Sequence, residues 1–179
     1  MKTNPARKAI ACDCPAASHL RDHLGYVDHT DAFKIGLNRT DLKIQDIHAA
    51  IFGHLPAGFR ALLYMRTIAV APLGIGGPRI GELIAPVKAE DSYRVGDKIG
   101  RWKIYALSEN QIITGGDDKH LDFRVSVLRV DDGHAAEIVV TTAVQTHNKF
   151  GRVYLATILP FHRIGVAQLL TNAAAANRI

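Results

Sequence analysis

The sequence predicts an α+β domain in which a curved antiparallel sheet grips one long C-terminal helix. Three observations lead to this fold class. Residues 120–130 and 136–146 alternate between apolar and polar positions, as half-buried strands do. Residues 151–176 form a long apolar segment with helical spacing. Two shorter helical patterns follow a single early strand, which favours α+β over repeated βαβ units.

The chain begins with a segment that has no clear periodicity and contains two prolines. We therefore expect residues 1–17 to be a mobile lead-in and residues 18–179 to form a single domain. Residues 26–36 predict the entry into a first strand, because turn-forming Asp and Thr residues precede Phe33 and Ile35.

Two helices are expected after this strand. The first covers residues 41–52, because Thr40 is a suitable N-cap and Gly53 a suitable C-terminal stop. One face of this helix carries three isoleucines: Ile44, Ile47 and Ile51. The second helix covers residues 57–71 and ends before Pro72, which cannot continue it.

The middle of the chain is rich in turn-forming residues. Gly and Pro are dense over residues 73–86, which predicts a loop followed by a short strand at residues 81–85. The polar residues 87–100 predict a further loop at a cavity mouth. Strands are predicted again at residues 101–107 and 111–114.

The last two strands form a hairpin around the turn at residues 131–133. The apolar face of the first strand should point at the C-terminal helix: Leu121, Phe123, Val125 and Val127. The opposite face is expected to be a solvated outer face: His120, Asp122, Arg124 and Ser126. Residues 147–149 break the second strand, and Pro160 should kink the helix that follows.

Composition excludes several classes of protein. The net charge of +5 is spread along the chain without a basic patch, so no nucleic-acid binding is expected. No secretory signal and no uncharged apolar stretch of membrane-spanning length is evident, which indicates a soluble cytoplasmic protein without a membrane span. The two cysteines, Cys12 and Cys14, cannot form a disulfide framework, which fits a reducing compartment.

Four phrases of the sequence are distinctive: DAF at 31–33, MRTIAVAPLGI at 65–75, DDKHLDFRVSV at 117–127 and THNKFGRVYLATILPFHR at 146–163. They resemble recurring elements of a bacterial family of unknown function, DUF2867, over roughly residues 18–172. That family is generally grouped with the START-like, helix-grip (polyketide cyclase-like) proteins. The resemblance implies a curved antiparallel sheet, two short helices after the first strand and a long C-terminal helix. It implies no reaction, so no catalytic residue is carried over.

Two segments of the sequence have features of a cofactor or metal site. The Gly-rich residues 74–81 do not form a phosphate-binding loop, because Arg79 stands at the third glycine position and Glu82 follows Gly81. The N-terminal segment has a spacing that can hold zinc, with little else to order it: Cys12, Cys14, His19 and His23. We expect neither a cofactor nor a bound metal.

Five polar side chains are the candidates for ligand contacts: Arg66, His120, His147, Tyr154 and His162. Arg66 lies in an apolar helix and either reaches water or pairs with a carboxylate such as Glu82. His120 could act as an acid–base group beside Asp122 or belong to a solvated face. The other three lie around the strand-to-helix junction, where ligand contact and capping or packing explain them equally well.

The sequence thus predicts a protein that binds a small apolar or amphipathic, lipid-like ligand between sheet and C-terminal helix. One alternative is an enzyme of the cyclase, dehydratase or isomerase type that uses a cavity histidine. Another is an interaction module with a filled core. A homodimer is compatible with each of them.

Overall fold

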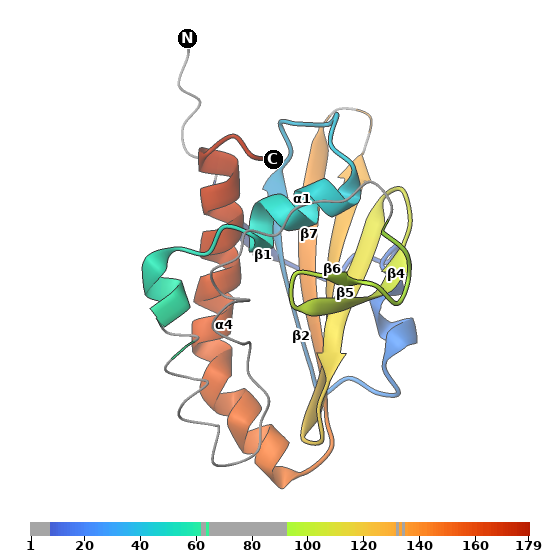
Figure 1. The fold of residues 1–179 in the computed structure, drawn as a ribbon, viewed down its shortest axis with the longest axis vertical. Helices are drawn as coiled ribbons and strands as arrows, with labels where there is room; N and C mark the ends of the chain where they lie inside the picture. The colour runs from blue at the N-terminus through green and yellow to red at the C-terminus, as the bar shows by residue number, and fades with distance from the viewer. Residues whose placement is uncertain (1–7, 62–63, 65–92, 132, 134) are drawn as a thin grey trace.

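The structure is a computed structural model that describes residues 8–61, 64, 93–131, 133 and 135–179. The described residues form one antiparallel sheet with the strand order β1-β2-β7-β6-β5-β4-β3 (Figure 1). Its strands are β1 (Ile10–Cys12), β2 (His29–Gly36), β3 (Lys98–Ile99), β4 (Trp102–Leu107), β5 (Gln111–Asp117), β6 (Leu121–Asp131) and β7 (Ala136–Thr146). The helices with defined bounds are the 3-10 helix η1 (His19–His23), α1 (Ile44–Phe52) and α4 (Lys149–Ala175).

Helices α1 and α4 pack on the same face of the sheet, which we call the inner face. The three isoleucines of α1 are buried there together with Val125 and Val127 of β6, and with Val166 and Leu169 of α4. The predicted α+β class, the antiparallel sheet and the long C-terminal helix are therefore confirmed. The arrangement fits a helix-grip-like fold, and the apolar side of β6 points at the helix as expected.

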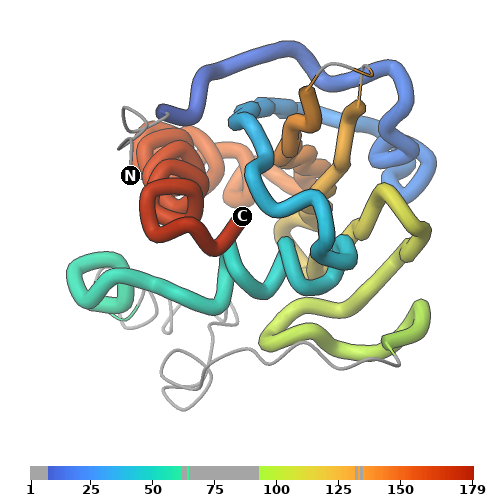
Figure 2. Tube along the Cα trace, turned by 90° about the horizontal axis from the view of Figure 1, so that it is seen from above, coloured from blue at the N-terminus to red at the C-terminus, as the bar shows by residue number. Residues whose placement is uncertain are grey.

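The opposite, outer face of the sheet is partly covered by the N-terminal segment (Figure 2). Leu20 of η1 is buried against Ile113 and Ala143. The expected solvated outer face is thus wrong for Arg124 and Ser126, which are both buried. A five-residue 3-10 helix has too short a pattern to be recognised from periodicity, so its cover over the sheet was not foreseen.

Part of the expected lead-in is an edge strand. Residues Ile10–Cys12 form β1, which pairs antiparallel with β2 and extends the sheet. The backbone N–H of Ala9 also donates to the hydroxyl of Thr171 in α4, at 3.1 Å. The expectation of a mobile lead-in without secondary structure is therefore wrong for residues 10–12. The domain boundary at residue 18 stays a prediction.

Helix α1 begins three residues later than expected. Lys43 is its N-cap and makes no side-chain capping hydrogen bond, so Thr40 is not the cap. Asp41 instead forms an ion pair with Arg39, at 2.9 Å, in the turn before the helix. Residues 57–61 of the second expected helix are described by the structure, and they are helical.

The region before β4 departs from the predicted loop in one detail. Residues Lys98–Ile99 form the short strand β3 at the sheet edge, within the segment 87–100 that was expected to be a loop. The Gly-rich residues 74–81 and the predicted strand at 81–85 lie outside the described residues.

Helix α4 begins as the strand-breaking residues predicted. Asn148 is its N-cap and accepts a hydrogen bond from the backbone N–H of Gly151, at 2.9 Å. The helix continues through Pro160 and changes direction along its length in Figure 1. By length and composition alone α4 could cross a membrane, although 28% of its most apolar window is buried in the fold.

Candidate functional site

A polar cluster lies on the otherwise apolar inner face, between the sheet and the middle of α4. It contains His29 and Asp31 of β2, Thr142 of β7, and His162 and Arg163 of α4. Asp31 is directly opposite Thr142 in the β2–β7 register. Because side chains alternate along a strand, Asp31 points to the same side of the sheet as the buried residues at 33 and 35.

The carboxylate of Asp31 is the centre of this cluster. Its Oδ2 lies 3.2 Å from Nε2 of His29 and 3.6 Å from Nε of Arg163. Its Oδ1 lies 3.5 Å from Nε2 of His162, which is also 3.1 Å from the hydroxyl of Thr142. The Asp31 side chain is only 4% exposed, so three potential cations surround a carboxylate that water barely reaches.

Asp31 is ionised despite its burial. Burial by itself raises the pKa of this carboxyl, but the hydrogen bonds and positive charges of His162 and His29 outweigh it. The resulting pKa lies below the usual value for aspartate. A buried charge of this kind is stabilised by its partners, so the cluster depends on the histidines from two different elements.

The contact between Asp31 and His162 orients the imidazole. Nε2 of His162 shares a hydrogen bond with the Thr142 hydroxyl at 3.1 Å, and its 3.5 Å approach to Oδ1 of Asp31 is an ion-pair contact. The negative charge of Asp31 on this side of the ring favours the proton on Nε2. The other ring nitrogen, Nδ1, has no partner among the described residues. In the neutral ring Nδ1 is then an acceptor, which is the state required of a general base or of an acceptor for a ligand hydroxyl.

A second histidine reaches the inner face from α1. His48 is fully buried, and its Nε2 lies 3.1 Å from the hydroxyl of Thr114 on β5. Burial, with a smaller contribution from the charge of Arg101, lowers the pKa of His48 to about 3. The ring is therefore neutral at physiological pH, and its Nδ1 has no hydrogen-bonding partner in the part of the chain that the structure describes.

The two histidines contact one cross-strand row of the sheet. The register places Thr114 beside Val125, and Val125 beside Thr142, which in turn lies opposite Asp31. Two strand spacings separate the threonines, which is about 10 Å. Helices α1 and α4 thus each place an imidazole on a threonine of the same row.

Aromatic rings lie next to His48 on the inner face. Trp102 packs against Phe52 and Phe123, with ring centroids 4.9 and 6.0 Å apart. The three rings are only partly buried, and they pack against the main core. Together they provide an apolar surface beside the His48–Thr114 contact.

Two of the predicted ligand residues lie at the junction of sheet and α4. Nδ1 of His120 is 3.2 Å from the Asn148 amide nitrogen, and its ring packs on Phe150. Nε2 of His147 is 3.1 Å from Oδ1 of Asp122. For His147 this contact fits the packing interpretation that the sequence left open, whereas His120 was expected to act beside Asp122 or to lie on a solvated face. A ligand contact for His120 or His147 stays a prediction.

Among the predicted residues that the structure describes, His162 is the one that meets the Asp31 cluster. Tyr154 is partly buried two turns earlier in α4, and Arg66 lies outside the described residues. Sequence reasoning missed His29, Asp31 and Thr142. The sequence did contain a sign of them. In the alternation of residues 29, 31, 33 and 35, His29 and Asp31 take the same side of the strand as the apolar Phe33 and Ile35.

The N-terminal cysteines and histidines are not gathered into a metal site. Cys12 belongs to β1, whereas His19 and His23 belong to η1. Nδ1 of His19 lies 3.3 Å from Asp22. Within the described part of the chain, no three His, Cys, Asp or Glu side chains are grouped so that they could hold a metal ion.

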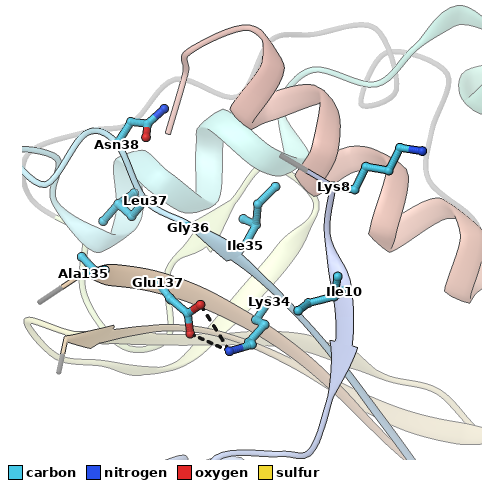
Figure 3. Close-up of a pocket in the computed structure, with 10 residues that line it drawn as sticks. Lys8, Ile10, Lys34, Ile35, Gly36, Leu37, Asn38, Ala135 and Glu137 are labelled. Carbon is cyan, nitrogen blue, oxygen red and sulfur yellow. Dashed lines mark hydrogen bonds and ion pairs between the residues drawn. The ribbon is translucent and has the colours of Figure 1, made fainter. Parts of the chain in front are cut away.

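A pocket of about 650 Å³ lies elsewhere, at the end of β2 (Figure 3). Residues of β1, β2 and the start of β7 line it, and the ammonium of Lys34 pairs with Glu137 there, at 3.0 Å. Asp31 does not line this pocket. The pocket and the Asp31 cluster are therefore separate features.

Comparison with known proteins identifies a family. The chain matches the family model described as "Protein of unknown function (DUF2867)" over residues 23–169, which includes β2, α1, the strands β3 to β7 and most of α4. No curated protein and no solved structure gives a significant match. The match covers most of the chain, including every residue of the Asp31 cluster, and the chain therefore belongs to the DUF2867 family.

Proposed function

We propose that this protein binds a small, largely apolar molecule between the inner face of its sheet and α4, and that the Asp31–His162 pair contacts one polar group of that ligand. The single observation that carries the proposal is the buried carboxylate of Asp31, gathered with His29, His162 and Arg163 between the sheet and α4. A few convergent polar groups beside apolar side chains are typical of a small-molecule site, and the partners of Asp31 offset the cost of burying its charge.

The surroundings of the pair define the ligand chemistry. The partly buried rings of Phe52, Trp102 and Phe123 favour an aliphatic or aromatic body. Nδ1 of His162, which no described residue contacts by a hydrogen bond, favours a hydroxyl, because a hydroxyl donates to an imidazole nitrogen and accepts from its neighbours. The proposal includes the START-like grouping and the cytoplasmic location, which rest on the resemblance and on the composition.

The first experiment is native mass spectrometry of the purified protein, followed by organic extraction and identification of what is released. A co-purifying lipid, polyketide or aromatic compound supports the proposal and defines the ligand class. A clean apo mass, together with no thermal shift across a panel of apolar ligands, contradicts it. That outcome favours the interaction module with a filled core.

The second experiment uses the only tryptophan of the chain as a reporter. Trp102 lies on the inner face, so occupation of this region by an extracted or panel compound should change its fluorescence. His162→Gln should weaken binding about tenfold, the usual effect of losing one buried hydrogen bond to a ligand. The matched control is His54→Gln, since His54 is an exposed histidine away from the cluster.

One observation favours a second candidate function, an enzyme that uses His162 as an acid–base group. Asp31 and Thr142 both contact Nε2 of the ring, and Nδ1 has no hydrogen-bond partner among the described residues, which resembles the arrangement of a carboxylate-oriented base. Incubation of the identified ligand with the protein should then yield an isomerised, cyclised or dehydrated product. His162→Gln should abolish turnover while the protein stays folded, with a melting temperature lowered no more than in Asp31→Asn, because both variants break the same buried contact. A complete loss of folding would indicate a structural role instead.

A further inference from the structure

Helix α4 presents an exposed apolar face on the side that points away from the sheet. Three large apolar side chains lie on it: Val153 (67% exposed), Phe161 (58%) and Ile164 (70%). Val153 and Ile164 are eleven residues apart, which is three helical turns, so they share one line along the helix. Thr157 and Pro160 are also exposed on this face and extend it without adding charge.

The charge beside this face has one sign. No Asp or Glu follows Glu137 in the sequence, so α4 contains no acidic residue. Lys149, Arg152 and Arg163 are exposed and lie along one flank of the apolar face, because their helical positions fall within a quarter turn of one another. The face therefore combines apolar side chains with a row of cations.

The opposite face of α4 is fixed in the fold. Leu155, Val166, Leu169 and Leu170 are buried against the sheet and α1. A helix that is held in this way can lie on a membrane surface, whereas spanning the bilayer would require it to leave its own core. The apolar composition of α4 is thus compatible with surface contact while the domain stays folded.

We propose that the exposed face of α4 docks on an anionic lipid surface. Val153, Phe161 and Ile164 would enter the boundary between headgroups and acyl chains, and Lys149 and Arg152 would contact anionic headgroups. Arg163, which pairs with Asp31, adds positive charge beside them without being required for the contact. A second copy of the same face is a poor partner, because pairing two such helices brings cations together without any carboxylate between them. This inference does not depend on the ligand proposed above.

The test is flotation of the full chain with vesicles in low salt. Vesicles of phosphatidylcholine with about one quarter phosphatidylglycerol should carry the protein upward, and pure phosphatidylcholine vesicles should carry much less. Replacing two apolar residues, as Phe161→Ser/Ile164→Ser, should lower the partition coefficient about tenfold or more, since each buried CH2 group contributes to binding. Replacing two cations, as Lys149→Gln/Arg152→Gln, should lower it about fivefold per charge.

Matched variants on other surfaces control for general effects. Ile10→Ser/Val95→Ser removes two apolar side chains of similar exposure, and Arg21→Gln/Lys98→Gln removes the same charge. Both should float like the wild type, and all variants should keep the wild-type melting temperature because the substituted residues are exposed. No flotation with anionic vesicles overturns the proposal. It is also overturned if the control pairs reduce flotation equally, or if the α4 variants abolish a dimer seen without vesicles.

Discussion

The imidazole of His162 in α4 lies 3.5 Å from the buried carboxylate of Asp31 in β2, and this contact joins the C-terminal helix to the inner face of the sheet. The guanidinium of Arg163 approaches the other carboxylate oxygen from the same helix turn. Near this point α4 contains Pro160, which weakens the helix by removing a backbone hydrogen bond. The Asp31 cluster therefore holds the helix to the sheet where its own backbone is least regular.

Replacing Asp31 by Asn should destabilise the protein by about 1–3 kcal/mol at neutral pH, because His29 and His162 lose their carboxylate partner. The pKa of Asp31 is lowered on folding, so its contribution is present above the pKa of an unfolded aspartate, about 4, and is lost as the pH falls below it. Urea unfolding of both proteins between about pH 3 and pH 7 measures the difference.

The control for this substitution is Asp13→Asn, since Asp13 is exposed and forms no ion pair with another described residue. Its unfolding free energy should stay close to that of the wild type at every pH. If Asp31→Asn shows the same small effect, or if its effect grows toward acid, the ionised Asp31 cluster does not stabilise the fold.

His48 should make the protein sensitive to mild acid. Its folded pKa of about 3 lies below the ordinary value of 6.5, so the unfolded chain takes up a proton that the folded chain does not. This contribution makes the free energy of unfolding fall by up to about 1.4 kcal/mol per pH unit as the pH decreases below about 6.5, until the folded pKa is reached. Guanidinium unfolding at a series of pH values measures the slope.

A double variant separates this effect from other titrations. His48→Leu/Thr114→Val replaces both hydrogen-bonding partners by apolar groups, which costs little because neither is left unsatisfied. Its free energy of unfolding should fall less steeply with acid than that of the wild type. Equal slopes in the two proteins would mean that His48 does not control the acid response.

The strands and the long helix were predictable because their signals are local. The alternation of residues 121–127 directly identified the side of β6 that packs under α4, and the phrase around Asn148 indicated the helix start. The start of α1 was misplaced by three residues, because Asp41 pairs with Arg39 instead of entering the first turn. A pattern of residue types does not show which of two possible partners a side chain such as Asp41 will take.

The candidate site was only partly predictable. His162 was identified as a ligand candidate, whereas Asp31 and Thr142 were not. These two residues meet His162 only because of the register of β2 with β7 and the position of α4. Neither can be read from the spacing of residues along the chain. Conversely, His147 was grouped with His162 by sequence proximity, although His147 lies before the start of α4 and contacts Asp122 there.

The N-cap of α4 provides a third prediction. Asn148→Ala should lower the free energy of unfolding by about 1 kcal/mol, the usual cost of removing a capping side chain. Asn148→Asp keeps the acceptor for the Gly151 N–H but loses the amide donor to the Lys119 carbonyl and to His120. It should therefore recover most of the stability if capping dominates, as thermal unfolding would show. Equal losses for Ala and Asp would assign the effect to the amide contacts instead.

A close approach between α4 and the residue before β6 makes a fourth prediction, at Gly151. A Cβ atom at this position would lie 2.1 Å from the carbonyl oxygen of His120, and a backbone atom cannot move aside without shifting the strand end. Gly151→Ala should therefore lower the free energy of unfolding by about 1–3 kcal/mol, although alanine favours helices. Gly58→Ala is the matched control, because residue 58 is also helical and its added Cβ meets nothing within 4 Å. It should leave stability unchanged or raise it by up to about 1 kcal/mol. Thermal unfolding of the two variants should then move in opposite directions from the wild type, and a stabilising Gly151→Ala would show that the helix start does not pack this closely on β6.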